Sequence, residues 1–418
     1  MRYLPLSLLL LLAAPALAQH QPVDPNAPKP PPLEWGKLET PFLSGHTQVT
    51  SRAHFVKAGE SYFSVDGKWV VFQATAVPEK GAEVDPFYAM YVAPCDLADV
   101  PSLGAPIRIS PALSANTCGW FHPKHPELVL LGSTIGRPAD EQKSGFQVGT
   151  RRYVWMFPAE MEVCERVVPE IAASRGVEVP ADTTIKPVFT LPNYDAECSY
   201  SPDGRYVLYA HVEDRPKDLA PDAPHKPDAN IYVYDTQKKT HTLIVGEKGY
   251  DGGPFWSPDG KRICYRSDRK GDDLLQIFMA DIKFNDAGEP VGIAHEYALT
   301  ENEHVNWCPF FHPSGEYLVY ATSESGHDNY EVYAMELDSA RLAEARASGS
   351  ASVKGLRRAR VTHATGADVL PAFTSDGKYM IWTSQRGPAV EGEMKPSSQL
   401  WIARVNGSPF AAGPELKP

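Results

Sequence analysis

Oxygen-bearing side chains recur at one position of a repeated motif in this chain. The motif is a tight turn, clearest as Ser201-Pro202-Asp203-Gly204, and an Asp or Asn stands seven residues before its proline position in five of six copies. These residues are Asn116, Asp195, Asp251, Asn306 and Asp368, and the first copy has Ala58 instead. Gathered in space, such oxygens bind calcium or a basic side chain of a partner. Asp and Asn also begin strands by bonding nearby backbone, so a structural role is the alternative.

Histidine is the second residue type that could do chemistry. His304 lies two residues before Asn306, and we expect it beside the same group. His122 and His312 occupy the serine position of their turns, which favours turn residues over metal ligands. The sequence holds no G-x-S-x-G, H-E-x-x-H, P-loop or G-x-G-x-x-G motif, so an active site would have to be assembled from scattered residues.

The candidate residues are carried by a unit that occurs six times. Its turns are 63–67, 121–125, 200–204, 256–260, 311–315 and 373–377. An aromatic-ended strand precedes each turn and an apolar run follows it. Proline presets φ, Asp bonds its own backbone and Gly accepts positive φ, so each copy predicts a β-hairpin.

Two further strands complete the unit. We expect a third, aromatic-rich strand at 87–92, 153–157, 231–234, 276–280, 331–335 and 399–403. A short fourth strand is expected at 107–110, 187–190, 242–245, 296–300 and 359–362. Repeated groups of four short strands are typical of propellers. The prediction is an all-β fold, a six-bladed β-propeller.

The last unit lacks a fourth strand, whereas residues 45–50 have that pattern and no unit before them. We therefore expect this N-terminal strand to complete the last blade and remove the open edge of the ring. The propeller would occupy 41–410, after a signal peptide at 1–18 and a Pro-rich tether at 19–40, with a tail at 411–418.

Long loops and cysteines complete the pattern. The inserts 134–151 and 211–228 should share the face of the Asp and Asn positions, and the insert 160–182 and a helix at 339–347 the opposite face. Of six cysteines, Cys118, Cys198 and Cys308 lie in apolar strands, where a free thiol is comfortable. A Cys95–Cys164 disulfide is the alternative for an exported chain.

Charge and hydropathy limit the partners. The net charge of −12 argues against nucleic acid. The apolar run near the N-terminus is too short to span a bilayer, and no later stretch is long enough. We therefore expect a periplasmic or secreted protein that does not span the membrane.

The strings at 200–204, 251–260 and 317–322 resemble the WD40-like (PD40) repeats of TolB-type propellers. The resemblance covers all six units. It implies a periplasmic six-bladed propeller of the kind that binds the peptidoglycan-associated lipoprotein in the Tol-Pal system. That family's namesake has an α/β domain before the propeller, and here only the tether precedes the first strand. Similar propellers are also fused to secreted peptidase domains.

Two functions follow as hypotheses. The first is a non-enzymatic scaffold that binds an envelope protein or peptide at a channel mouth ringed by the five Asp and Asn residues with His304, with calcium as the candidate cofactor. The second is a polysaccharide lyase or hydrolase, because oligogalacturonate-lyase-like propellers have similar repeats and a His-bound metal near the axis. The segment 121–128, with His122 and His125, is similar to theirs.

Overall fold

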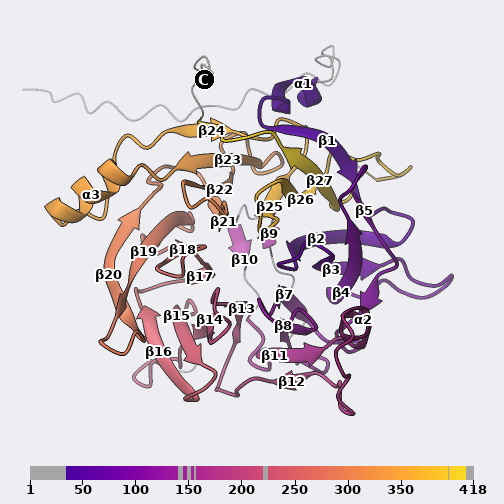
Figure 1. The fold of residues 1–418 in the computed structure, drawn as a ribbon, viewed down its shortest axis with the longest axis horizontal. Coiled ribbons are helices and arrows are strands. Elements are labelled where there is room, and N and C mark those ends of the chain that lie inside the picture. The colour runs from indigo at the N-terminus through magenta and orange to yellow at the C-terminus, as the bar shows by residue number, and fades with distance from the viewer. Residues whose placement is uncertain are drawn as a thin grey trace, which may run out of the picture. The chain divides into compact units, whose positions relative to one another are not determined.

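A computed structural model describes residues 34–139, 145–147, 152–154, 157–219, 225–393 and 395–410. Six antiparallel sheets follow one another around a ring, as Figure 1 shows. The six-bladed β-propeller predicted from the repeats is therefore confirmed. The predicted signal peptide, most of the predicted tether and the predicted tail lie outside the described residues.

The strands of each blade follow one another outward from the axis. Blade one is β2 (Phe55–Phe63), β3 (Trp69–Ala76), β4 (Ala89–Asp96), β5 (Ser102–Leu103) and β6 (Ile107–Arg108); blade two is β7 (Asn116–Phe121), β8 (Leu128–Ser133), β11 (Glu162–Val167) and β12 (Lys186–Pro187). Blade three is β13 (Asp195–Tyr200), β14 (Tyr206–Val212), β15 (Ala229–Asp235) and β16 (Thr240–Val245); blade four is β17 (Asp251–Trp256), β18 (Arg262–Ser267), β19 (Gln276–Phe284) and β20 (Pro290–Ala298). Blade five is β21 (Asn306–Phe311), β22 (Tyr317–Thr322), β23 (Glu331–Glu336) and β24 (Arg358–Arg360); blade six is β25 (Asp368–Phe373), β26 (Tyr379–Ser384), β27 (Gln399–Val405) and β1 (Leu43–Gln48).

The N-terminal strand closes the ring, as predicted. β1 pairs antiparallel with β27, with Leu43 opposite Val405 and Gln48 opposite Trp401. The outer edge of blade six is thus supplied by the opposite end of the chain. Closure of this kind covers an edge that would otherwise be open to other strands.

The repeated turn owes its recurrence to a small hydrogen-bond network. In blade three the Ser201 hydroxyl donates to Asp203 Oδ1 at 2.5 Å, and the backbone N–H of Tyr206 donates to Ser201 Oγ at 3.0 Å. Gly204 has φ +80°, which only glycine adopts without strain. The same Ser-to-Asp bond occurs in blades one and four.

Some expected elements lie elsewhere. The third strand of blade two is β11, whereas the aromatic run at 153–157 belongs to an insertion that contains β9 (Gly145–Gln147) and β10 (Arg152–Val154). The prediction gave weight to aromatic residues, and β11 contains none, so it chose the wrong segment. Three helices also occur in the described ranges: α1 (Trp35–Glu39), α2 (Pro169–Ser174) and α3 (Ser339–Ser348). Helix α1 packs beside β1, so residues 34–40 belong to the folded unit rather than to the tether.

All six cysteines are free, so the Cys95–Cys164 disulfide is not formed. Both residues lie on third strands, β4 and β11, of neighbouring blades, and Cys164 is fully buried. Burial raises the pKa of both thiols to about 12. They behave as small apolar side chains of the core.

Candidate functional site

The five predicted Asp and Asn residues begin the inner strands of blades two to six, and the three Asp carboxylates each bond within their own blade. Asp195 Oδ1 lies 2.9 Å from His211 Nδ1, and Asp251 Oδ1 accepts from Arg269 at 3.0 Å. Asp368 accepts from Arg386 at 2.8 Å. All three carboxylates are fully buried. Burial raises their pKa values and the cationic partners oppose it, so mutual repulsion in a ring is not the cause.

The two asparagines have the same kind of role. Asn116 accepts from the Ser133 hydroxyl at 2.7 Å and donates to the carbonyl of Tyr88 at 2.8 Å. Asn306 donates to the carbonyl of His304 at 3.1 Å, so the predicted proximity of His304 is present through its backbone. These positions join the start of each inner strand to its neighbours, which is the structural role that Asp and Asn often have at strand ends.

A different set of residues faces the propeller axis. Two residues after each of the five Asp or Asn positions, and after Ala58 in the first blade, the inner strand bulges, and the residue there has φ between +42° and +58°. These six bulge residues are Glu60, Cys118, Glu197, Gly253, Cys308 and Leu370. Positive φ is costly outside glycine and marks backbone held by its surroundings. A bulge changes the direction in which the side chain points, and the sequence repeat alone does not reveal this change.

Glu60 collects donors from blades one and two. Its carboxylate accepts from the Cys118 thiol at 2.8 Å, from the Tyr62 hydroxyl at 3.3 Å and from the Thr117 hydroxyl at 3.3 Å. Glu60 is only 8% exposed. Burial raises the pKa of its carboxyl group, and Cys118 and Arg266 oppose that rise only in part.

Glu197 collects donors from blade four. Both of its oxygens accept from the Tyr250 hydroxyl, at 2.8 and 2.7 Å, and one accepts from Arg266 at 3.3 Å. The backbone N–H of Gly253 also donates to it. Arg266 donates to the Tyr250 hydroxyl at 2.7 Å, so the three side chains form one cluster. A Cβ at Gly253 would overlap the Arg266 guanidinium, which explains the glycine at this bulge.

Aromatic rings close the axis beneath this layer. Tyr62, Trp120, Phe255 and Phe310, from blades one, two, four and five, contact one another with centroids 5.1 to 6.1 Å apart. Side chains of opposite blades can meet only near the centre of the ring. The carboxylates of Glu60 and Glu197 therefore rest on an apolar floor. We call Glu60, Cys118, Glu197, Tyr250 and Arg266 the axial layer.

The insertion of blade two reaches the same place. In Figure 1 its strands β9 and β10 are seen over the centre of the ring. Where the insertion ends, the ring of Phe157 packs against Tyr194 and Tyr250, with centroids 5.0 and 5.8 Å apart. The axial layer thus lies on the face that carries this long insertion.

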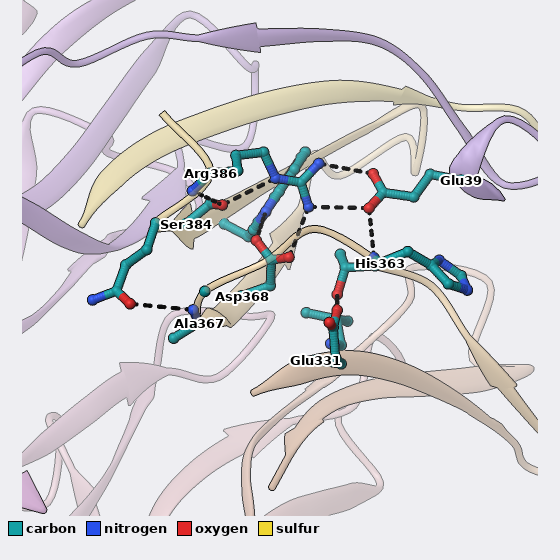
Figure 2. A network of polar contacts seen from close by, with 12 residues as sticks. Glu39, Glu331, His363, Ala367, Asp368, Ser384 and Arg386 are labelled. Carbon is teal, nitrogen blue, oxygen red and sulfur yellow. Dashed lines mark hydrogen bonds and ion pairs between the residues drawn. The ribbon is translucent and has the colours of Figure 1, made fainter. Parts of the chain in front are cut away.

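A second buried network fixes the N-terminal segment to blade six (Figure 2). Arg386 donates to Glu39 of α1 at 2.8 Å and to Asp368 of β25 at 2.8 Å. The rings of Trp35, Trp382 and Trp401 surround its guanidinium at 4.4 to 5.7 Å. This network explains why Asp368 is buried without facing the axis.

The His-bound metal of the lyase hypothesis finds no matching ligand set in the described ranges. His122 and His125 form a pair with centroids 5.0 Å apart at the turn of blade two. His304 and His312 lie at the two ends of the inner strand of blade five. No three His, Cys, Asp or Glu side chains of the described part gather in an arrangement that could hold a metal ion. Nor is any described helix long and apolar enough to cross a membrane.

The comparisons with known proteins relate parts of the chain to peptidases. No family model matches. Dipeptidyl-peptidase 5 of Porphyromonas gingivalis is 38% identical over 88 residues, which are 20% of this chain and 12% of that protein. An uncharacterised peptidase of Bacillus subtilis, YuxL, is 25% identical over 204 residues, 44% of this chain and 28% of that protein. The chain thus spans less than a third of the length of either relative.

Solved structures show similar architecture at low identity. TolB of Acinetobacter baumannii has a TM-score of 0.45 and 14% identity, over 84% of this chain and 63% of that one. Oligogalacturonate lyase of Vibrio parahaemolyticus has a TM-score of 0.45 and 10% identity, over 86% and 93%. The sheet topology of the chain itself identifies it as a six-bladed β-propeller.

Proposed function

We propose that this chain is an exported, non-enzymatic propeller that binds a peptide or protein partner of the cell envelope, and that a basic group of the partner is received at the axial layer. One observation carries the proposal: the carboxylate of Glu197 pairs with Arg266 in a buried layer at the axis, and the carboxyl group of Glu60 lies near enough for Arg266 to oppose the rise of its pKa. The binding position thus moves from the predicted Asp and Asn ring to the bulge residues beside it.

Electrostatics favours a cationic ligand. With both glutamates ionised, the charged side chains of the axial layer sum to one negative charge, and a buried charge without compensation is costly. The raised pKa of Glu60 reflects this cost, because burial favours the protonated carboxyl group and a second cation would favour the ionised one. The Arg266 guanidinium already lies over the ring of Tyr250, 5.6 Å from its centroid, so the aromatic surroundings of the layer suit a cationic group. Calcium is the alternative cation for the same carboxylates.

The relatives favour a peptide as the ligand class. Two of the proteins that match parts of this chain are named peptidases, one of them a dipeptidyl-peptidase. The peptidoglycan-associated lipoprotein implied by the TolB-like resemblance is one protein partner of the proposed kind. A periplasmic or secreted location belongs to the same proposal.

Calorimetric titration with two matched peptides tests the proposal. The first is an N-acetylated, C-amidated pentapeptide with lysine between two pairs of glycines, and the second has norleucine in place of lysine. We expect saturable binding of the lysine peptide alone, at least about tenfold weaker to a Glu60→Gln/Glu197→Gln variant, since hydrogen bonds to charged groups contribute about 1.5–3 kcal/mol. Asp195→Asn is the control, because its carboxylate faces His211 within blade three.

The outcomes separate the alternatives. Binding should weaken as the pH falls, because Glu60 then holds its proton. Equal binding of both peptides, or no effect of the double substitution, would refute a basic group at the axial layer. Saturable heat of binding in a titration with calcium, and none with the peptide, would show that the carboxylates bind a metal ion. Release of unsaturated products from polygalacturonate would favour the lyase over the binding module.

A further inference from the structure

A groove of about 700 Å³ lies between blades three and four, beside their Asp-Gly turns. Its walls include Tyr206 of β14, Trp256 of β17, and Ile282 and Phe284 of β19. The inner strands run from the axial layer toward these turns, so the groove is at the opposite end of the blades. It is therefore independent of the proposed function.

A second hollow of about 390 Å³ adjoins the first between blades four and five. Asp259 and Arg262 line both, and the second hollow adds Phe311 and Pro313. The two hollows thus flank the turn of blade four and extend across three successive blades. An elongated ligand fits such a track better than a single compact molecule.

Two donors in the wall of the groove have no partner in the described structure. The hydroxyl of Tyr206 and the indole N–H of Trp256 are buried and make no hydrogen bond to any described residue. Tyr206 is only 7% exposed, and Trp256 packs against the same apolar cluster. Leaving a buried donor unsatisfied costs about 1–3 kcal/mol. A ligand that brought acceptor atoms to these two donors would remove this cost.

Most charged side chains of the groove already make polar contacts, whereas Lys261 is exposed. Arg262 donates to Asp281 at 2.8 Å, and Arg346 of α3 donates to the other oxygen of the same carboxylate. Asp259 accepts from the Ser257 hydroxyl at 2.6 Å and from the N–H of Lys261 at 3.0 Å. These pairs hold the walls in place. What the groove offers a ligand is therefore aromatic surface and hydrogen-bond donors.

We propose that this groove binds an extended, proline-rich peptide segment of a partner protein. Proline rings pack on aromatic walls, and the polyproline II helix leaves its carbonyls free to accept bonds from Trp and Tyr donors. The helix rises about 3.1 Å per residue, so an extended segment can continue from the groove into the second hollow. A preformed helix of this kind also loses little entropy on binding.

The test uses fluorescein-labelled decaproline and a Gly-Ser decamer as probes, followed by fluorescence anisotropy. We expect saturable binding of decaproline to the full chain and none of the Gly-Ser decamer. Tyr206→Phe and Trp256→Phe each remove one donor and keep an aromatic ring, and each should weaken binding about fivefold, as expected for one hydrogen bond of about 1 kcal/mol. Glu34→Ala, at the surface beside blade six, should leave the affinity unchanged.

Folding controls keep the result decisive. Because the Tyr206 hydroxyl has no partner within the described residues, Tyr206→Phe should unfold at the same or a higher urea concentration. A loss of stability would mean that the hydroxyl serves the fold, and would overturn its role as a ligand donor. Absence of decaproline binding, or equal binding by both variants and the parent, would also overturn the proposal. Competition by oligogalacturonide but not by unlabelled decaproline would assign the groove to saccharides.

Discussion

The guanidinium of Arg386 and the carboxylate of Glu39 form a two-pronged ion pair between residues 347 positions apart in the chain. The two bonds measure 2.8 and 3.1 Å, and the side chains are 1% and 0% exposed. His46 of β1 adds a contact of 2.8 Å to the same carboxylate. The pair therefore fastens α1 and β1, the closing elements, to the body of blade six.

Glu39→Ala should destabilise the protein strongly, because it leaves Arg386 buried with half of its ionic partners. Removing one member of a buried pair costs about 3–5 kcal/mol, and urea unfolding followed by circular dichroism would measure it. Glu34→Ala is the matched control, since Glu34 pairs with Lys37 at the surface and should contribute about 0–1 kcal/mol. Arg386→Met combined with Glu39→Ala should recover part of the loss. A cost below about 1 kcal/mol for Glu39→Ala would contradict the fastening role.

Two truncations test the closure of the ring. A chain that starts at Glu34 keeps α1 and β1 and should melt close to the parent temperature. A chain that starts at Ser51 lacks both and exposes β27 as an open edge, so it should melt far lower or aggregate. Differential scanning calorimetry of both chains gives the comparison. Equal melting temperatures would show that β1 adds little to the propeller.

The architecture was predictable from the sequence because the residues of the repeated turn determine its backbone conformation. Ser201, Asp203 and Gly204 each have a local reason to be there, and that reason recurs from blade to blade. The axial layer was missed because its members differ in type from blade to blade, so no repeat marks Glu60 and Glu197. Glu197 lies two residues after Asp195, and Glu60 two residues after Ala58, which has the equivalent place in the first copy. Only the bulges show that this position faces the axis.

Glu331 should make stability depend on pH in the opposite sense from an ordinary surface carboxylate. Burial and the neighbouring Asp368 raise its pKa to about 8, although Arg360 opposes the shift. The folded state then holds a proton that the unfolded state has released, so stability falls as the pH rises from about 4.5 to about 8. The slope reaches about 1.4 kcal/mol per pH unit for one proton. Urea unfolding at several pH values should show this decline in the parent and a flatter curve for Glu331→Gln. Parallel curves for the two would contradict the raised pKa.

Gly253→Ala should disturb the axial layer more than the backbone alone predicts. Gly253 has φ +58°, and a Cβ there would overlap the guanidinium of Arg266. Gly271→Ala is the control, because Gly271 has φ +72° with open space around its Cβ position, so it shows the strain of positive φ alone, about 1–2 kcal/mol. We expect Gly253→Ala to cost more than this control in urea unfolding. The substitution should also weaken the binding of the lysine peptide, because Arg266 must leave its place between Tyr250 and Glu197. The opposite outcome is that both alanine variants lose the same stability and keep the same affinity for the lysine peptide. The Arg266 guanidinium would then be free to move, and the charge balance proposed for the axial layer would not depend on its position.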